Sequence, residues 1–538
     1  PWETTSAWLA RRRRRRVRAA LVPGQRATCR IRARGSAQRV AETRTSCAGQ
    51  NSACPAMALC ESLALFILGA ALLIFLQRRQ RYAHWRDIDP SILKNGASAK
   101  KLAACGDADY VIVGSGLGGL TSAALLSRAG FKCVVLEQHD VAGGSTHTFT
   151  EKGFTFDVGV HYVGSVLDRW WSPVRKLVAV TAPGVEWDEV DEVLDAVVND
   201  VTGESFEVHK DPTKKAAAYA SIEAGSAAAV RRYRRCCFFT KIVAFTLLAC
   251  KLLPRWMMPT WLLGRAWRWA FERSAKDVLA RCGLSERVAG ACAYIYGTYG
   301  EIPSRTPFAM HAMLEQHYDK GGFFPRGGSA VLGLAQVKEI NDAGSHVFVR
   351  ARVDQILLEG NKCVGVSCKG VAIKARCGVI SGAGVANTFG RMLPKEVGAP
   401  ILAKLKGCDP SLGFAYLFIG LDGTAEELGI KNTNLWYMAP GGSSNWDHDI
   451  ANERVEASAE PFGSTDERPP VVLISPGSAK DSTWNERHPG TATLQMIAAP
   501  MPFCAERKSG RYTSPLPRRR DPGRRRRVAA TPVVTSKA

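Results

Sequence analysis

The sequence predicts an α/β fold in which a dinucleotide-binding β-α-β unit is interleaved with an α+β substrate domain. Residues 109–113 form an apolar run typical of a buried strand, and a helix is expected after it as far as about Gly130. A second short strand is expected at residues 133–136 and ends in Glu137. Between the first strand and the helix lie three glycines in the pattern G-x-G-x-x-G, namely Gly114, Gly116 and Gly119.

This glycine loop has the chemistry needed to hold a diphosphate. Glycines allow a tight turn, let a diphosphate approach bare backbone, and let the helix pack close to the strand. The first turn of the helix directs unpaired N–H groups and the positive end of its dipole at the ligand. Glu137 lies 23 positions after Gly114, where a carboxylate accepts hydrogen bonds from a ribose. The loop residues predicted to bind the cofactor are Gly114, Ser115, Gly116, Leu117, Gly118 and Gly119.

Gly143 and Gly144 come soon after Glu137 and are also predicted to bind the cofactor. The order of glycine loop, Glu and Gly-Gly resembles FAD-binding oxidoreductases of the glutathione-reductase type more than NAD dehydrogenases. The resemblance implies an FAD/NAD(P)-binding Rossmann-like domain with FAD as cofactor. NAD or NADP is then an electron donor or the alternative cofactor.

The chain begins with a strongly basic segment, residues 1–56, which contains 13 Arg and two Glu. Such a stretch buries too little apolar surface to order itself, so we expect a disordered leader. It has the composition of a transit segment. The alternative, which we favour, is upstream sequence that is not translated, with Met57 as the first residue.

Residues 57–82 are predicted to be a signal-anchor or membrane segment. The apolar core from Leu63 to Leu76 is 14 residues long, and it is followed by the basic run QRRQR. The absence of small residues there argues against a cleaved signal peptide. The basic residues favour a cytoplasmic position for the downstream end.

The first FAD-binding segment, residues 107–200, carries the most specific resemblance. The stretch GGSTHTFTEKGFTFDVGVHYVG is similar to the retinol saturase family and, more distantly, to carotenoid isomerases and phytoene desaturases. The family motif Asp-x-Gly-x-His-Tyr matches at Asp157, Gly159, His161 and Tyr162. The carotenoid isomerases lack the His-Tyr pair, which favours the retinol saturase branch.

Residues 201–325 are predicted to be a helical part that faces the substrate or a membrane. Residues 231–273 mix an apolar run with basic residues and four tryptophans at positions 256, 261, 267 and 269. The run is too short and too interrupted for a clean span. A segment lying in the bilayer interface and an ordinary buried helical pair both fit this pattern. The aromatic-Pro-Arg-Gly-Gly turn at Phe324–Gly328 again resembles the retinol saturase family.

Residues 326–395 are predicted to return to the FAD-binding domain. A helix is expected at Ser329–Asp342, a strand at His346–Val353, and hairpin strands at residues 355–358 and 363–368. The resemblance implies that the backbone of Val353 lies beside the adenine. It also implies Asn at position 382, where this chain has glycine.

Residues 396–504 are predicted to form a substrate-domain sheet from the segments FAYLFIGL, NLWYMAP, VVLISPG and TATLQMIAAP. The resemblance ends near Pro502. Residues 505–538 show no apolar periodicity, and we expect a disordered basic tail. The resemblance implies a further C-terminal segment that closes over the flavin, and nothing in this tail replaces it.

Charge and cysteine usage exclude several function classes. The two ends, residues 1–56 and 505–538, carry +11 and +9 of the formal net charge of +23, so the core is nearly neutral and a nucleic-acid partner is not expected. The 16 cysteines show no C-x-x-C spacing, so no metal site is expected. Free thiols of a reducing compartment are the simplest interpretation, with a lumenal location as the alternative.

The resemblance implies a membrane-associated flavoenzyme that saturates a double bond of a retinoid or carotenoid-like polyene. The endoplasmic reticulum is the expected location, or a plastid if the leader is a transit segment. The electron donor is not identified. His161 is a tentative proton donor, since imidazole holds a proton near neutral pH, and a purely structural role for it is the alternative. His147 and Tyr162 have weaker claims.

Two other functions fit the same sequence. A carotenoid cis-trans isomerase or desaturase would use the same fold and cofactor but would give a product with a different hydrogen count. A non-catalytic lipid-binding protein on this fold would explain Gly382 and the expected lack of a closing segment.

Overall fold

The computed structural model of the 538-residue chain describes residues 84–167, 172–250, 260–406, 408, 413–457, 469–501 and 529–533. The expected leader at 1–56 and the expected membrane segment at 57–82 lie outside the described residues. Within the described stretches, no helix has both the length and the apolar composition that crossing a membrane requires.

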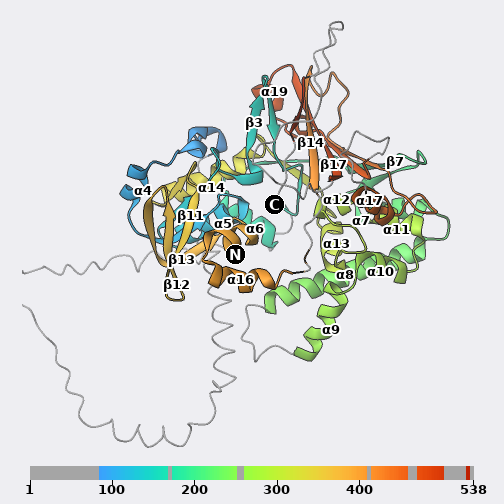
Figure 1. Cartoon of the computed structure of the whole chain (residues 1–538). Coiled ribbons are helices and arrows are strands. Elements are labelled where there is room, and N and C mark those ends of the chain that lie inside the picture. Colours follow the sequence, from blue (N-terminus) through green and yellow to red (C-terminus); the bar gives the residue numbers. More distant parts are fainter. Residues whose placement is uncertain are drawn as a thin grey trace, which may run out of the picture. The chain divides into compact units, whose positions relative to one another are not determined.

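A six-stranded sheet is built around the predicted β-α-β unit (Figure 1). Its order is β10-β2-β1-β13-β12-β11, in which β10, β2, β1 and β13 run parallel and the last two pairs are antiparallel. The strands are β1 (Ala108–Val113), β2 (Cys133–Leu136), β10 (His346–Phe348), β11 (Val353–Glu359), β12 (Lys362–Cys368) and β13 (Val371–Ser381).

Most of these strands were predicted, but the strand expected over His346–Val353 is divided in two. Strand β10 ends at Phe348, and β11 begins at Val353. The break falls at Arg350, whose φ of +52° lies in the left-handed region and turns the chain out of the sheet.

Alternation along β1 sends its side chains into two cores. Ile112 packs with Leu120 of α5 and Val337 of α14 on one face. Val111 and Val113 face the other side, toward α4 and the β11–β13 strands. Both faces of the sheet are therefore covered, as buried parallel strands require. These helices are α4 (Ala99–Cys105), α5 (Leu117–Arg128) and α14 (Ala330–Asp342).

A seven-stranded sheet has the order β18-β14-β17-β16-β15-β7-β8, and every neighbouring pair is antiparallel except β15 with β7. The four strands predicted after Pro410 are confirmed as β14 to β17. The strands are β7 (Val193–Asn199), β8 (Ser205–His209), β14 (Gly413–Asp422), β15 (Asn434–Met438), β16 (Val471–Ser475), β17 (Thr491–Met501) and β18 (Ala529–Val533).

Two features of this sheet correct the sequence analysis. Strand β7 lies in the segment 107–200 that was assigned to the nucleotide domain, yet it pairs with β15 of the substrate sheet. Strand β18 lies in the tail 505–538, which was expected to be disordered, yet it pairs along β14. Each of these strands forms because it hydrogen-bonds to a strand that is distant in sequence. The local sequence pattern does not indicate such a pairing.

A helical part, α7 to α13, connects β8 to β9. Its side chains share one large core with the seven-stranded sheet, in which Tyr219, Tyr233 and Trp436 are almost fully buried. The helices are α7 (Pro212–Ser221), α8 (Ala227–Cys250), α9 (Thr260–Phe271), α10 (Ala275–Arg281), α11 (Glu286–Cys292), α12 (Tyr296–Tyr299) and α13 (Phe308–Glu315).

Short strands link the two large sheets. The hairpin of β3 (Thr148–Glu151) and β4 (Phe154–Asp157) packs on β17, and β9 (Gly322–Pro325) joins β5 (Val163–Gly164) to β6 (Trp187–Glu189). The remaining elements are η2 (Trp85–Asp87), η3 (Pro90–Lys94), η4 (Gly144–Thr146), α6 (Pro173–Thr181), α15 (Val385–Asn387), η6 (Thr388–Met392), α16 (Lys395–Ala403), α17 (His448–Ala457), α18 (Gly477–Lys480) and α19 (Trp484–Arg487).

Candidate dinucleotide-binding site

The glycine loop after β1 has the backbone that the sequence predicts. Gly114 has a φ of +93°, which glycine adopts without strain. A Cβ at Gly119 would lie 2.1 Å from the carbonyl oxygen of Gly114, so glycine is needed for α5 to pack this closely. A Cβ at Gly116 or Gly118 would meet no heavy atom within 4 Å. The loop therefore presents bare backbone to open space at the start of α5, where an anion is favoured.

Gly143 and Gly144 form a wall against this loop. Their φ angles of +121° and +57° both lie in the region that favours glycine. The N–H of Gly143 donates to the carbonyl oxygen and the Oγ of Ser115, both at 3.2 Å. A Cβ at Gly144 would lie 2.8 Å from the Cα of Gly116. The two glycine segments therefore meet backbone to backbone, and the buried Ser115 ties them together.

Glu137 lies at the end of β2, directly beside the loop. Its Oε2 accepts hydrogen bonds from the N–H and the Oγ of Ser115, both at 2.8 Å, and its Oε1 accepts one from the N–H of His139 at 2.8 Å. A carboxylate offers about four acceptor positions. Glu137 is therefore held rigidly by three donors and retains acceptor capacity for a ribose hydroxyl.

The segment before β11 passes the same end of β2. The N–H of Ala351 donates to the carbonyl oxygen of Glu137 at 2.6 Å, and the N–H of Arg350 donates to that of His139 at 2.7 Å. Val353 follows two residues later and is 7% exposed. The structure thus brings Val353 and Glu137, which are 216 positions apart in sequence, into one neighbourhood.

Gly382, the position where the resemblance implies Asn, lies against the glycine loop. Its N–H donates to the carbonyl oxygen of Val113 at 2.8 Å. A Cβ at this position would lie 3.3 Å from that oxygen, which is a tight but not forbidden contact. The glycine therefore leaves the loop without the amide side chain that the resemblance implies, while the backbone arrangement itself is complete.

The Asp157–Tyr162 segment is joined to the second glycine pair by a short path. The N–H of Val158 donates to the carbonyl oxygen of His147 at 3.2 Å, and His147 follows Gly144 by three residues. The Oδ1 of Asp157 accepts from the N–H of Ser329 at the start of α14, at 2.8 Å. The motif is therefore fixed between the glycine wall and the Phe324–Gly328 turn.

The two histidines named from the sequence lie on this path. His147 contacts the carbonyl oxygen of Gly144 through its Nδ1, so it braces the glycine wall. His161 is partly buried and lies within the Asp157–Tyr162 segment. The structure assigns neither histidine a chemical step.

Tyr162 is anchored by a buried carboxylate. Its hydroxyl donates to Asp195, 3.2 Å from each carboxylate oxygen, and Asp195 is 1% exposed. Asp195 also accepts from Tyr294 at 2.7 Å and from the amide of Asn434 at 2.9 Å. Burial, and then the Asp195 charge, raise the pKa of Tyr162 well above its ordinary value, so its hydroxyl keeps its proton.

Comparisons with known proteins agree with this geometry. Residues 112–177 match the NAD(P)-binding Rossmann-like domain family, and this range contains the glycine loop, Glu137 and the Asp157–Tyr162 segment. The all-trans-retinol 13,14-reductase of Danio rerio is 34% identical over 77% of this chain and 69% of its own length. The Homo sapiens all-trans-retinol 13,14-reductase is 32% identical over 76% of this chain and 67% of its own length.

This chain belongs to the all-trans-retinol 13,14-reductase family. A more distant relative is the chloroplastic prolycopene isomerase of Daucus carota, 26% identical over 54% of this chain and 48% of its own length. The predicted family is therefore confirmed, together with the Rossmann-like α/β domain. As a member of a reductase family, the chain is an oxidoreductase with an NAD(P)-binding Rossmann-like domain.

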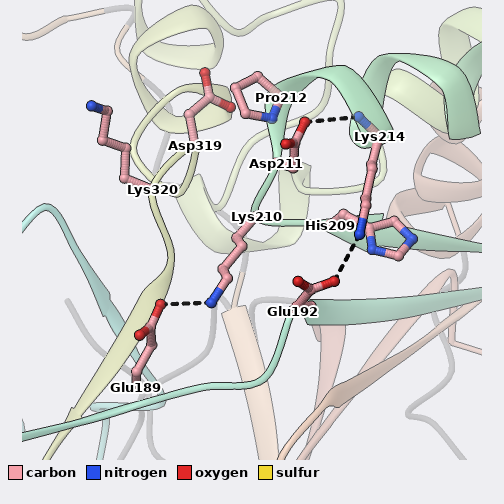
Figure 2. Close-up of a pocket in the computed structure, with 9 residues that line it drawn as sticks. All are labelled: Glu189, Glu192, His209, Lys210, Asp211, Pro212, Lys214, Asp319 and Lys320. Carbon is pink, nitrogen blue, oxygen red and sulfur yellow. Dashed lines mark hydrogen bonds and ion pairs between the residues drawn. The ribbon is translucent and has the colours of Figure 1, made fainter.

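The chain also has a polar pocket of about 310 Å³ around the end of β8 and the start of α7 (Figure 2). Lys210 and Lys214 pair with Glu189 and Glu192, each at 2.8 Å, so cations and carboxylates across this pocket largely balance. It shares no residue with the glycine loop or with the Asp157–Tyr162 segment. The lining residues are Glu189, Glu192, His209, Lys210, Asp211, Pro212, Lys214, Asp319 and Lys320.

Sequence reasoning did not single out Asp195, Asn434 or Lys480, although all three surround Tyr162 in the structure. Each is a polar residue in or beside an apolar run, which is a weak signal by itself. Their sequence separations of 33 to 318 positions from Tyr162 hide the cluster until the strands are paired.

Proposed function

We propose that this chain is an FAD-dependent oxidoreductase that saturates a carbon–carbon double bond of a retinoid or carotenoid-like polyene. The observation that carries the proposal is the junction at His147 and Val158, which joins a diphosphate cradle to the Asp157–Tyr162 segment. The family supports the substrate class, since the relatives are named for all-trans-retinol and prolycopene.

The residues present fit a dinucleotide such as FAD. The Gly114–Gly119 loop would hold the diphosphate, because a Cβ at Gly116 or Gly118 would meet nothing within 4 Å, and Gly144 packs directly against Gly116 to fix the loop. Glu137 would accept from the adenosine ribose, and the backbone near Val353 would lie beside the adenine. NAD or NADP would then serve as a source of electrons, or as the alternative occupant.

Saturation of a double bond adds a hydride to one carbon and a proton to its neighbour. Bound FAD, once reduced, supplies the hydride. The chain must orient the polyene, exclude water and hold a proton beside the second carbon. We assign the proton donor to His161 because imidazole holds a proton near neutral pH, and a role in fixing the flavin loop is the alternative.

The mass of the product tests the proposed function. Purified protein would be assayed for FAD by absorbance and then incubated without oxygen, with a chemical reductant and all-trans-retinol or a carotenoid. A product heavier by two hydrogens supports saturation. A rearranged product of unchanged mass indicates an isomerase, and bound lipid without conversion indicates a binding protein. In a parallel incubation with oxidised FAD as electron acceptor and no reductant, a product lighter by two hydrogens indicates a desaturase.

Replacing Glu137 by Ala should prevent retention of FAD. The change removes the ribose acceptor and leaves the buried N–H of Ser115 without its partner. A hydrogen bond to a charged group contributes about 1.5–3 kcal/mol, so affinity should fall roughly 10- to 100-fold or more. FAD per chain after gel filtration is the measurement. Asp140→Ala, which removes an exposed acid three residues away, is the control, and an FAD content equal to wild type in Glu137→Ala would refute this role.

We also propose that one face of α8 and α9 binds the surface of a lipid bilayer, from which an apolar polyene would enter. Helices α8 and α9 pack against each other (Figure 1). Large apolar side chains on them are 44–61% exposed: Phe238, Phe239, Ile242 and Phe245 on α8 and Trp267 on α9. We call these five residues the α8–α9 apolar face.

The charges around this face favour anionic headgroups. Residues 227–271 contain nine Lys or Arg and no Asp or Glu. Arg231 and Arg235 are exposed on α8, N-terminal to the apolar residues, and Arg265 and Arg268 are exposed on α9. Phe238, Ile242 and Phe245 follow the i, i+4, i+7 spacing of one helical stripe. An apolar stripe flanked by cations is the composition of an interfacial helix.

The α8–α9 apolar face should hold the protein on membranes together with residues 57–82. Deleting 57–82 should weaken attachment without abolishing it, whereas the same deletion combined with Phe238→Glu and Phe245→Glu should release the protein. The measurement is co-sedimentation with vesicles containing anionic phospholipid. Leu428→Glu, which puts a charge on an exposed apolar residue outside α8 and α9 at 43% exposure, is the control. Sedimentation that is unchanged by the Phe substitutions in the deleted background would contradict the assignment.

A further inference from the structure

Lys480 is a buried lysine that the chemistry outlined above does not use. It ends α18 and is 3% exposed. Its Nζ donates to the Oγ of Ser475 at 2.8 Å and to the Oδ1 of Asn434. The same nitrogen lies 5.5 Å from the centre of the Tyr162 ring, within the range of a cation–π interaction.

Asp195 carries the negative charge that balances Lys480, and the side-chain amide of Asn434 links the two residues. The carbonyl oxygen of the Asn434 side chain accepts from Lys480, while its amide nitrogen donates to Asp195 at 2.9 Å. The same carboxylate accepts from the hydroxyl of Tyr162. Lys480 therefore contacts the ring of Tyr162 and, through Asn434 and Asp195, orients its hydroxyl. We call these four residues the Lys480 cluster.

Such a cluster is costly to build for stability alone. Burial of an ammonium and a carboxylate loses their hydration, and replacement of a buried ion pair by apolar side chains is often neutral or stabilising. The cluster also surrounds Tyr162, a member of the Asp-x-Gly-x-His-Tyr motif, rather than an arbitrary core position. A role in the reaction explains both its cost and its place.

We propose that Lys480 is a positioning residue for double-bond saturation: its positive charge, acting through Asn434 and Asp195, fixes Tyr162 and the Asp157–Tyr162 segment beside the reactive part of the dinucleotide. The inference rests on the proposed function. It assigns no proton transfer to Lys480, whose Nζ contacts Ser475, Asn434 and the Tyr162 ring.

The charge of Lys480 changes within the neutral pH range. Burial lowers the pKa of its ammonium from 10.5 to about 7, although the nearby Asp195 and Asp157 act in the opposite direction. The titratable groups that face it are Asp195 on β7, Asp157 on β4, and Tyr162. A neutral amine would no longer balance the Asp195 carboxylate, so the hold on Tyr162 weakens. Saturation should therefore decline as pH rises through about 7.

Stability as a function of pH tests the titration without any activity assay. Between about pH 7 and 10.5 the folded lysine is neutral and the unfolded one is charged. The unfolded state then binds more protons, so this group makes stability rise with pH across that window. Lys480→Met and Lys480→Arg should both lack this rise. Lys276→Met, which removes a lysine paired with Asp447 and Asp449 at 3.0 and 3.1 Å, should keep it.

The pH profile of saturation tests the positioning role. Lys480→Met should bind FAD normally but turn over roughly 10- to 100-fold more slowly than the wild type below pH 7, as expected when a reacting geometry is loosened, and the difference should narrow above pH 7, where the wild-type lysine is neutral. Lys480→Arg keeps the charge and should retain activity above pH 7, where the wild type declines. If Lys480→Met fails to fold, Lys480→Met/Asp195→Asn removes both charges and should fold but remain slow.

Two failures can be told apart. If wild type yields no product heavier by two hydrogens, the proposed function fails, and this inference fails with it. If wild type saturates its substrate and Lys480→Met, or the double variant, matches its rate and pH profile, the role of Lys480 is overturned and the proposed function stands.

Discussion

A Gly116→Val protein is expected to fold normally and to retain no FAD. The φ and ψ of Gly116 are −62° and 169°, an extended conformation that valine adopts readily, and an added Cβ meets nothing within 4 Å. The new side chain would occupy the space that a diphosphate must enter. Loss of two backbone hydrogen bonds to a charged group, at about 1.5–3 kcal/mol each, weakens binding roughly 100-fold or more.

The measurement is FAD per chain after purification, together with the melting temperature of the apoprotein. Gly96→Val is the matched control, because a Cβ at Gly96 also meets nothing within 4 Å and lies outside the glycine loop. Gly119→Val should behave differently from both, since its Cβ collides with the Gly114 carbonyl oxygen at 2.1 Å and the fold itself should suffer. Stoichiometric FAD in Gly116→Val would show that no diphosphate lies on this loop.

The nucleotide half of the fold was predictable because its signals are local. The strand, the glycine loop, the helix and the acidic strand end occur in one stretch from Asp109 to Gly144. Gly119 and Gly144 are required because a Cβ would collide with the backbone of Gly114 and Gly116, while Gly116 and Gly118 leave open space in front of the loop. A local pattern of this kind fixes a local backbone, and the structure reproduces it.

The substrate half was only partly predictable, because its partners are distant in sequence. Strands β14 to β17 follow from their alternation, but nothing within β7 indicates that it pairs with β15, more than 230 positions later. Asp195, in the middle of β7, was overlooked for the same reason. The role of Asp195 depends on its hydrogen bonds with Asn434 and Tyr162, which lie beside it only in the folded chain.

Helix α8 shows a third situation, in which composition left the surroundings of a segment open. The apolar run in residues 231–273 is too short and too interrupted for a clean membrane span, and α8, from Ala227 to Cys250, does not meet the requirements for one. Its exposed cations, Arg231 and Arg235, lie N-terminal to its exposed apolar residues on the same helix. Tyr233 and Cys237 are fully buried, while Phe238 and Phe239 face outward.

Replacing Glu315 by Ala should destabilise the protein by about 3–5 kcal/mol, the usual cost of breaking a buried ion pair. Glu315 and Lys215 are each 2% exposed, and their charged atoms lie 3.4 Å apart. Arg234 also bonds Glu315, at 2.6 Å, and both cations pair with Asp319, at 2.6 and 2.8 Å. Without Glu315, two buried cations share one carboxylate.

A double-mutant cycle separates the pair from its surroundings. Glu315→Ala/Lys215→Met removes one charge of each sign and leaves the Arg234–Asp319 pair intact, so it should be less destabilised than the sum of the two single variants, by about 1–3 kcal/mol. Denaturant unfolding provides the measurement. Glu301→Ala, which breaks the more exposed Arg305–Glu301 pair, should cost no more than about 1 kcal/mol. Additive single effects would mean that the four charges act independently, and that this part of the core is held together by its aromatic side chains instead.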